Sequence, residues 1–347
     1  MLSKENRELY LVWLCLFLIV LPNISFSQSD PIIAKSDDKL VKIFRRKEPR
    51  PKILEFDYTY LPDVHVDGTS ETLGNSSADI KSNIRASLKV KIPFILKPNF
   101  KLLGGYNFST EIFTFRDAQG MHASYYNDLN GRSLTSTSVS MFMKKNFTKD
   151  KFLYGFLNAG LHSDKIAFSE TTDQFKSNIA FIYVKNTSPI SQMGYGGGFG
   201  YIFGGPIIFP IMIINRTFSE HWNLEALLPQ AINFRYTFSD EMYLIFINEI
   251  NGGSYFLRNP TVEGFDRVTL QRSAFIPRLR FEREIYDFIW FGLDFGYNVP
   301  INLYLGEPRK SKSDAVVMFD NSPSFIFNFS FFLVVPKKIL YKASKPR

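Results

Sequence analysis

The sequence predicts an all-β protein: a transmembrane up-and-down antiparallel β-barrel of about 14 strands, with about 12 strands as the alternative. Three observations support this prediction. Apolar and polar residues alternate along much of the chain, turn signals recur about every ten residues in its central stretch, and long connections tend to alternate with short ones. No stretch after residue 27 has the roughly 18 to 20 uninterrupted apolar residues that a membrane-spanning helix needs.

Residues 221–238 show the alternation most clearly, with a turn signal at Pro229-Gln230 between two alternating segments. One parity of the two segments is apolar and comprises Trp222, Leu224, Ala226, Leu228, Ile232, Phe234, Tyr236 and Phe238. A loop of Pro229 to Ala231 would pair Leu228 with Ile232, Leu224 with Tyr236 and Trp222 with Phe238, and would set Glu225 opposite Arg235. The predicted hairpin therefore has one apolar face and one face with an ion pair.

The same pattern divides the chain from Lys52 onward into about fourteen segments. They lie near residues 53–61, 82–96, 100–115, 133–147, 151–163, 176–184, 192–204, 207–218, 221–228, 232–238, 242–257, 268–284, 287–305 and 323–335. The thirteenth is much longer than a sandwich strand of about 5 to 6 residues, which favours a tilted membrane strand. The last carries a stripe of phenylalanines and would aggregate at an open sheet edge, so we expect it to close against the first segment.

The connections between these segments fall into two classes. The long ones, rich in Gly, Ser, Asn and Asp, are 62–81, 116–132, 164–175, 258–267 and 306–322, and all follow odd-numbered segments. Short turns follow the even-numbered segments, which predicts long loops outside, short turns inside and both termini inside, as in an outer-membrane barrel. Two outer connections, 205–206 and 229–231, are short, so we expect a low wall there.

The two ends of the chain differ from the barrel segments. Residues 1–27 resemble a signal peptide, because Lys4 and Arg7 precede the apolar run from Leu9 to Leu21 and small residues follow it. Residues 28–51 are expected to form a flexible basic periplasmic arm, 52–335 the outer-membrane barrel and 336–347 a basic C-terminal tail. Cys15 lies inside the signal, so the mature chain would form no disulfide and would keep its formal net charge of +8. Dispersed basic residues in an exported chain make nucleic acid an unlikely partner.

Three stretches carry a resemblance to a known family. They are the glycine-alternating segment followed by Phe209-Pro210, the stretch NRTFSEHWNLEALLPQAINFRYTFSDEMYL, and INEINGGSY. In these the chain resembles the uncharacterised outer-membrane β-barrel proteins of Bacteroidota, a domain-of-unknown-function family. The resemblance implies a barrel in the outer membrane of a Gram-negative cell and implies no active site.

The parity of the segments also predicts which side chains face the lumen. The charged candidates are Arg85, Lys89, Lys91, Glu111, Glu225, Arg235, Glu249, Arg278, Arg280, Glu282 and Asp294. They could form ion pairs that rigidify the wall, or a constriction that selects small anionic solutes. Phe218, Trp222 and Phe238 are expected in the aromatic girdle at the inner membrane–water interface.

No residue pattern indicates catalysis. The four histidines, His65, His122, His162 and His221, show no metal-ligand spacing, so neither a metal nor a cofactor is expected. His162 and Ser163 are adjacent in a strand and would point to opposite faces, which excludes them as a hydrogen-bonded catalytic pair. The chain is therefore predicted not to be an enzyme.

The predicted function is porin-like passage of small solutes across the outer membrane. The alternatives are a structural or adhesive barrel that acts through its outer loops, and a transporter of hydrophobic, fatty-acid-type substrates. The expected partners are outer-membrane lipid, the barrel-assembly machinery and small solutes.

Overall fold

The structure is a computed structural model that describes residues 49–120, 123–167, 171–201, 204–258, 260, 262, 264–308, 310 and 312–337. The predicted signal peptide, His122, residues 28–48 of the predicted arm and residues 338–347 of the predicted tail lie outside these ranges. No helix in the described ranges is long and apolar enough to cross a bilayer.

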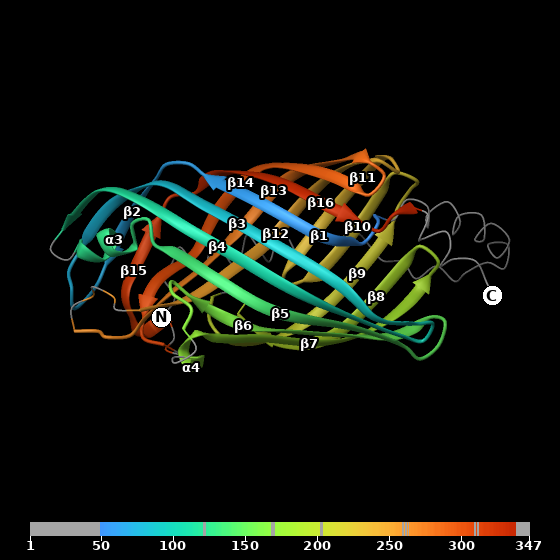
Figure 1. Cartoon of the computed structure of the whole chain (residues 1–347), viewed down its shortest axis with the longest axis horizontal. Helices are drawn as coiled ribbons and strands as arrows, with labels where there is room; N and C mark the ends of the chain where they lie inside the picture. Colours follow the sequence, from blue (N-terminus) through green and yellow to red (C-terminus); the bar gives the residue numbers. More distant parts are fainter. Residues whose placement is uncertain are drawn as a thin grey trace, which may run out of the picture. The chain divides into compact units, whose positions relative to one another are not determined.

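Fourteen antiparallel strands form a closed barrel, as predicted (Figure 1). Consecutive strands are hydrogen-bonded from β3 to β14, and β1 closes the ring by pairing with both β3 and β16. The strands of this ring are β1 (Lys52–Leu61), β3 (Ser76–Lys97), β4 (Phe100–Gly120), β5 (Ser133–Asn146), β6 (Lys151–Ser163), β7 (Phe175–Ser188), β8 (Ser191–Gly200), β9 (Ile207–Thr217), β10 (Trp222–Leu228), β11 (Ala231–Ser239), β12 (Met242–Leu257), β13 (Val268–Tyr286), β14 (Ile289–Gly306) and β16 (Ser324–Val334).

The alternation of the sequence becomes the two faces of this wall, because successive strand residues point to opposite sides. On β16, Phe325, Phe327 and Phe329 are exposed on the outside, whereas Ile326 and Ser330 are buried on the inside. The outward phenylalanines contact their neighbours on β14: the Phe295 ring stacks on Phe325 at 5.6 Å and lies tilted against Phe327 at 5.3 Å between centroids. Apolar residues therefore cover the outer face at the seam where the barrel closes.

Two strands at this seam are interrupted, which the sequence pattern did not reveal. β2 (Val64–Thr69) follows β1 after a short break, and β15 (Ala315–Asn321) precedes β16. β2 pairs with β3 and β15, and β15 pairs with β14. The seam is thus closed once by β1 and β16 and a second time, toward the outer end, by β2 and β15.

The end of the barrel with the long connections, which we call the outer end, is narrower than the strand number implies. There β12 pairs directly with β6 at Phe256 and Ser163, bypassing the five strands β7 to β11. Two short helices, α3 (Ser124–Leu129) and α4 (Thr171–Gln174), lie in the connections at this end (Figure 1). Of the predicted long loops, 62–81, 116–132, 164–175 and 306–322 contain ordered elements: β2, α3, α4 and β15.

The predicted register of the β10–β11 hairpin is wrong by two residues. Trp222 pairs with Tyr236, Leu224 with Phe234 and Ala226 with Ile232, while Asn233, not Arg235, lies opposite Glu225. The cause is the position of the turn: Leu227 pairs with Ala231, so the three-residue loop is 228–230 and not 229–231. A shift of two keeps every side chain on its predicted face. The predicted ion pair therefore survives diagonally, with 2.7 Å between Arg235 Nη2 and Glu225 Oε1.

Several predicted strand ends are also wrong. β3 begins at Ser76 and not near residue 82, β4 ends at Gly120 and not near 115, and β7 ends at Ser188 and not near 184. β8 ends at Gly200 rather than near residue 204. The Tyr201 N–H donates to the Asn178 side-chain oxygen at 2.8 Å, and Gly204 has a positive φ of 87°. These features turn the chain toward β13, where a Cβ on Gly204 would lie 2.9 Å from the Arg272 carbonyl oxygen.

Candidate functional site

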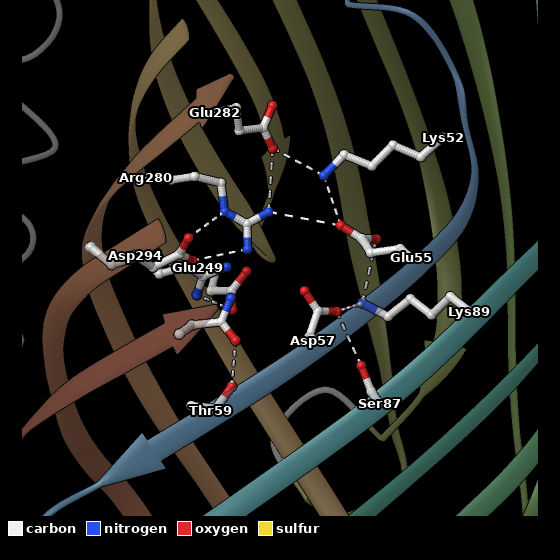
Figure 2. A network of polar contacts seen from close by, with 12 residues as sticks. Lys52, Glu55, Asp57, Thr59, Ser87, Lys89, Glu249, Arg280, Glu282 and Asp294 are labelled. Atoms are coloured by element: carbon white, nitrogen blue, oxygen red, sulfur yellow. Dashed lines mark hydrogen bonds and ion pairs between the residues drawn. The ribbon is translucent and has the colours of Figure 1, made fainter. Parts of the chain in front are cut away.

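The lumen side of β1, β3, β12, β13 and β14 carries a network of charged side chains (Figure 2). Asp294 is its centre: its Oδ1 accepts a hydrogen bond from Arg280 Nε at 2.7 Å, and its Oδ2 lies 2.8 Å from Arg278 Nε. The Asp294 side chain is 1% exposed. A buried carboxylate between two guanidinium groups is well compensated, whereas losing either partner would leave charge in a poorly hydrated place.

The network continues from β13 to β1, although β14 and β16 lie between these strands. Lys52 Nζ lies 3.0 Å from Glu282 Oε1 and 2.7 Å from Glu55 Oε1, and Arg280 approaches Glu55 at 3.9 Å. On the next strand, Lys89 Nζ is 3.2 Å from Asp57 Oδ2 (Figure 2). Long side chains on the concave face thus connect non-adjacent strands across the seam.

A second ion-pair group crosses the lumen closer to the outer end. Glu111 on β4 accepts a hydrogen bond from Arg272 Nε on β13 at 2.6 Å and from Arg85 Nε on β3 at 2.9 Å. β4 and β13 are separated in the ring by β3, β1, β16 and β14, so this contact spans the interior. We call Arg85, Glu111 and Arg272 the cross-lumen strut. The Glu111 side chain is 2% exposed.

Beyond the strut, an apolar plug fills the outer end. Helix α3 places Tyr125, Tyr126 and Leu129 inside, where they are almost completely buried against Phe319 and Leu270. Tyr125 and Tyr126 both hydrogen-bond to the Ser76 hydroxyl. A cavity of about 10 Å³ remains within this plug, which is at the lower limit for a single water molecule. Among the described residues, the plug is therefore tightly packed.

Arg132 connects α3 to β6 and β12, the two strands whose pairing narrows the outer end. Its guanidinium donates to Asp164 on the β6 side at 2.9 Å, to the Arg258 carbonyl on the β12 side at 3.2 Å, and to Asp128 in α3. Asp164 in turn accepts from the Arg258 N–H at 3.1 Å. One side chain therefore connects α3 to both strands that narrow the barrel.

The wall of β6 to β9 has a different lining. Phe152, Ile182, Val184, Ile211 and Ile213 form a buried apolar cluster on its inner face. On β8, between these residues, the inward positions are glycines. A Cβ on Gly196 would lie 2.0 Å from the Phe181 carbonyl oxygen, and one on Gly194 would lie 2.7 Å from Val184 Cγ2. The glycines let neighbouring side chains and backbone occupy the space.

The predicted lumen candidates divide into three groups in the structure. Arg85 and Glu111 belong to the strut, and Lys89, Glu249, Arg278, Arg280, Glu282 and Asp294 belong to the network. Glu225 and Arg235 form their own pair on β10 and β11. Lys91 is exposed and forms no ion pair or hydrogen bond with any residue in the described ranges.

Sequence reasoning missed Lys52, Glu55, Asp57 and Arg272, which complete the network and the strut. Glu55 and Asp57 were detectable in principle, because they alternate with Phe56, Tyr58 and Tyr60. Lys52 was not, because it has the opposite parity and the register shifts between Lys52 and Leu54. Arg272 lacks such a signal, since all residues from Val268 to Ala274 are buried.

The predicted girdle residues Phe218, Trp222 and Phe238 are all exposed and lie beside the short turns 217–222 and 239–242. Trp222 and Phe238 both contact the ring of Tyr236, with centroid separations of 4.9 and 4.8 Å. Their position at a membrane interface stays a prediction.

His162 and Ser163 do not interact. Ser163 Oγ donates to the Phe256 carbonyl at 2.9 Å, and His162 Nε2 lies 3.4 Å from Ser136 Oγ on β5. Within the described residues no carboxylate forms an ion pair with His162, so the third group of a catalytic triad is not present beside it.

Comparison with known proteins gives a family and distant structural matches. The model of a domain of unknown function, DUF6268, matches residues 52–338. A search of curated proteins found no significant match. Among solved structures, the Pseudomonas putida toluene transporter TodX is 6% identical with a TM-score of 0.31, covering 82% of this chain and 91% of that one. The translocator domain of the autotransporter NalP from Neisseria meningitidis is 8% identical with a TM-score of 0.27, covering 86% of this chain and 95% of that one. A bacterial polysaccharide outer-membrane secretin is 9% identical with a TM-score of 0.34, covering 82% and 99%.

Proposed function

The chain belongs to the DUF6268 family, and we propose that it is an outer-membrane barrel that passes small solutes through a lumen closed at its outer end. The phylum Bacteroidota stays a prediction, because the family match names none. The single observation behind the proposal is that a connecting segment, α3, supplies Tyr125, Tyr126 and Leu129 to the apolar cluster at the outer end, beside side chains of the strands. The part of a closure that a connecting segment makes can move without breaking the barrel.

The outer surface supports a membrane location. Large apolar side chains are exposed on strands all around the barrel, including Tyr58, Phe108, Met141, Phe181, Tyr195, Ile208, Phe246, Phe295 and Phe327. A soluble monomer rarely exposes apolar area on this scale, whereas lipid chains would cover it. We expect the protein in the outer-membrane fraction, and we expect the unboiled protein to migrate faster on a gel than the boiled protein. Recovery of a soluble periplasmic monomer would contradict this location.

The inner part of the lumen supports passage. Inward side chains there remain accessible, among them Phe156 on β6 and Glu225 on β10. Toward the outer end, by contrast, the strut and the plug remove such access. We therefore expect the wild-type protein to conduct rarely, because the plug must move first.

Planar-bilayer recordings of refolded protein test the proposal. A variant in which residues 123–131 are replaced by a Gly-Ser linker removes α3, and Glu111→Ser added to it removes the strut. We expect stepwise conductance from the first variant and larger steps from the second. The matched control is a Gly-Ser replacement of the inner turn 148–150, which should conduct like the wild type. If all variants fold and none conducts, the barrel is a structural scaffold instead.

A further inference from the structure

The inner face of β3 to β6 carries lysines beside accessible aromatic rings, and the strand registers place them in three parallel rows. The first row is Lys91, Gly105, Ser140 and Asn158, paired in that order across the four strands. The second is Leu103, Phe142 and Phe156, and the third is Lys101, Lys144 and Tyr154. Rows two residues apart on a strand are separated by about 6.5 to 7 Å. An apolar row therefore lies between two rows that carry cations.

All three rows face the lumen. Lys89, which shares the parity of Lys91, binds the inward Asp57. Tyr154 packs on the buried cluster of Phe152 inside the barrel, which fixes the even-numbered residues of β6 on the inner face. On β5, Phe142 contacts Tyr154 with 5.2 Å between ring centroids.

Each of the three rows has an accessible side chain. Phe156 is 41% exposed although it points inward, and Lys91 and Lys101 are also exposed. In the described part of the chain neither Lys91 nor Lys101 has an ion-pair partner. The lysines of the network, by contrast, each contact carboxylates. Gly105 adds no side chain between Lys91 and Ser140, and the Ser140 hydroxyl turns over it, 2.5 Å from where a Cβ on Gly105 would lie.

Lys144 forms cation–π contacts with two aromatic rings on this face. Its ammonium lies 3.9 Å from the centroid of the Phe152 ring and 5.5 Å from that of Tyr154. Lys101 is its direct cross-strand neighbour, and two like charges in this position repel each other. An anion between them would relieve the repulsion, and an apolar body attached to that anion would cover Phe156 and Phe142.

We propose that this face, formed by Lys91, Lys101, Lys144, Phe142, Tyr154 and Phe156, binds organic anions that have an aromatic body, such as aromatic carboxylates. The carboxylate contacts a lysine row, and the ring lies on Phe156 and Phe142. Ser140 and Asn158 offer further hydrogen-bond donors in the first row. The assignment of a solute class rests on the proposed function, but the binding itself requires no passage.

Equilibrium dialysis with the full-length mature protein in lipid nanodiscs tests the site, with empty nanodiscs subtracted. The probes are benzoate, benzamide, which keeps the ring without the charge, and acetate, which keeps the charge without the ring. We expect benzoate to bind at least about tenfold more tightly than either of the others, because only benzoate satisfies both rows.

Variants locate the site. Lys91→Gln and Lys144→Gln should each weaken benzoate binding by roughly tenfold without altering the gel mobility of the folded barrel. Phe156→Ser should weaken benzoate and leave the weak acetate binding unchanged. Lys149→Gln, in the exposed inner turn, is the matched control and should leave binding unchanged. The proposal is overturned if benzoate binds no better than benzamide, or if Lys149→Gln weakens it as much as Lys91→Gln.

The outcomes separate this site from the proposed function. Benzoate binding without any conductance, even from the variant that lacks α3, would refute passage and keep the site. Conductance without preferential benzoate binding would keep passage and refute the site.

Discussion

The two sides of the lumen are stabilised in different ways. On the side of β1, β3 and β12 to β14, charged ends of long side chains meet across several strands, as in the 3.0 Å contact of Lys52 with Glu282. On the side of β7 to β9, glycines let the backbone and aliphatic side chains pack closely. The first side depends on matched charges, whose long side chains can reach across several strands. The second side depends on glycines on β8, where a side chain would collide with its neighbours. The two sides should therefore fail under different substitutions.

The largest effect is expected from reversing the charges next to Asp294. In the double variant Arg278→Glu, Arg280→Glu, carboxylates would surround Asp294, which is buried and loses both partners. We expect the free energy of unfolding to fall by about 3–5 kcal/mol for each broken pair, with poor folding yield. Urea unfolding followed by gel mobility measures this, with Arg283→Glu on the same strand but exposed as control. A well-folded double variant with a reversal potential shifted toward cations would show instead that these charges are well hydrated.

A smaller loss is expected where one carboxylate is removed from the strut. Glu111→Ala leaves Arg85 and Arg272 facing each other in a buried place, which should cost about 3–5 kcal/mol. Glu225→Ala removes a carboxylate that is 41% exposed but leaves Arg235, whose side chain is 4% exposed, so it should cost less, about 1–3 kcal/mol. Equal losses in the two variants, measured by the same urea titration, would mean that burial does not distinguish the two ion pairs.

Adjacent glycines on β8 test the other side of the lumen. A Cβ at position 196 would collide with the Phe181 carbonyl oxygen, whereas one at position 197 would lie 3.9 Å from the nearest atom, the Phe209 carbonyl oxygen. We expect Gly196→Ala to destabilise the barrel by about 1–3 kcal/mol and Gly197→Ala to be tolerated. Refolding yields of the two variants compared under identical conditions decide this, and similar yields would refute close packing at β8.

The smallest effect concerns a solvent-accessible pair on the outer extension of the seam, in which the His65 and Asp79 side chains are 56% and 31% exposed. The hydrogen bond to Asp79, 2.8 Å from His65 Nδ1, raises the pKa of His65 above its ordinary value. A raised pKa in the folded state means that the pair stabilises the fold below the unfolded-state pKa of His65, and that this contribution is lost as pH rises through the folded-state pKa. Titration of the His65 ring by NMR should show the raised pKa in the wild type and a smaller rise in Asp79→Asn, because Asp67, 3.3 Å from His65 Nε2, also raises the pKa. An unchanged titration in that variant would exclude Asp79 as the cause.

The sequence predicted the wall well and the interior contacts poorly, for a physical reason. Segments such as 151–163 and 242–257 match β6 and β12 at both ends, because alternation is a local property of each strand. The strut and the plug depend on which strands face each other across the lumen, and alternation does not contain that information. Helix α3 is too short for a recognisable helical period, and Arg272 lies in a run buried on both sides. The hairpin register failed by two residues because period two leaves such a shift undetected.

The double closure of the seam has a kinetic consequence. Lys52 pairs with Val334, and Val66 with Asn321, so these contacts join residues from nearly opposite ends of the barrel sequence. Pairing between such distant segments has the largest entropic cost of loop closure, so we expect it to form late in folding. The β2–β15 and β1–β16 pairings are separate ladders of hydrogen bonds. Either can form first and keep the two ends of the barrel sequence close while the other pairing forms. The interrupted strands thus provide the slowest step of assembly with two independent starting points.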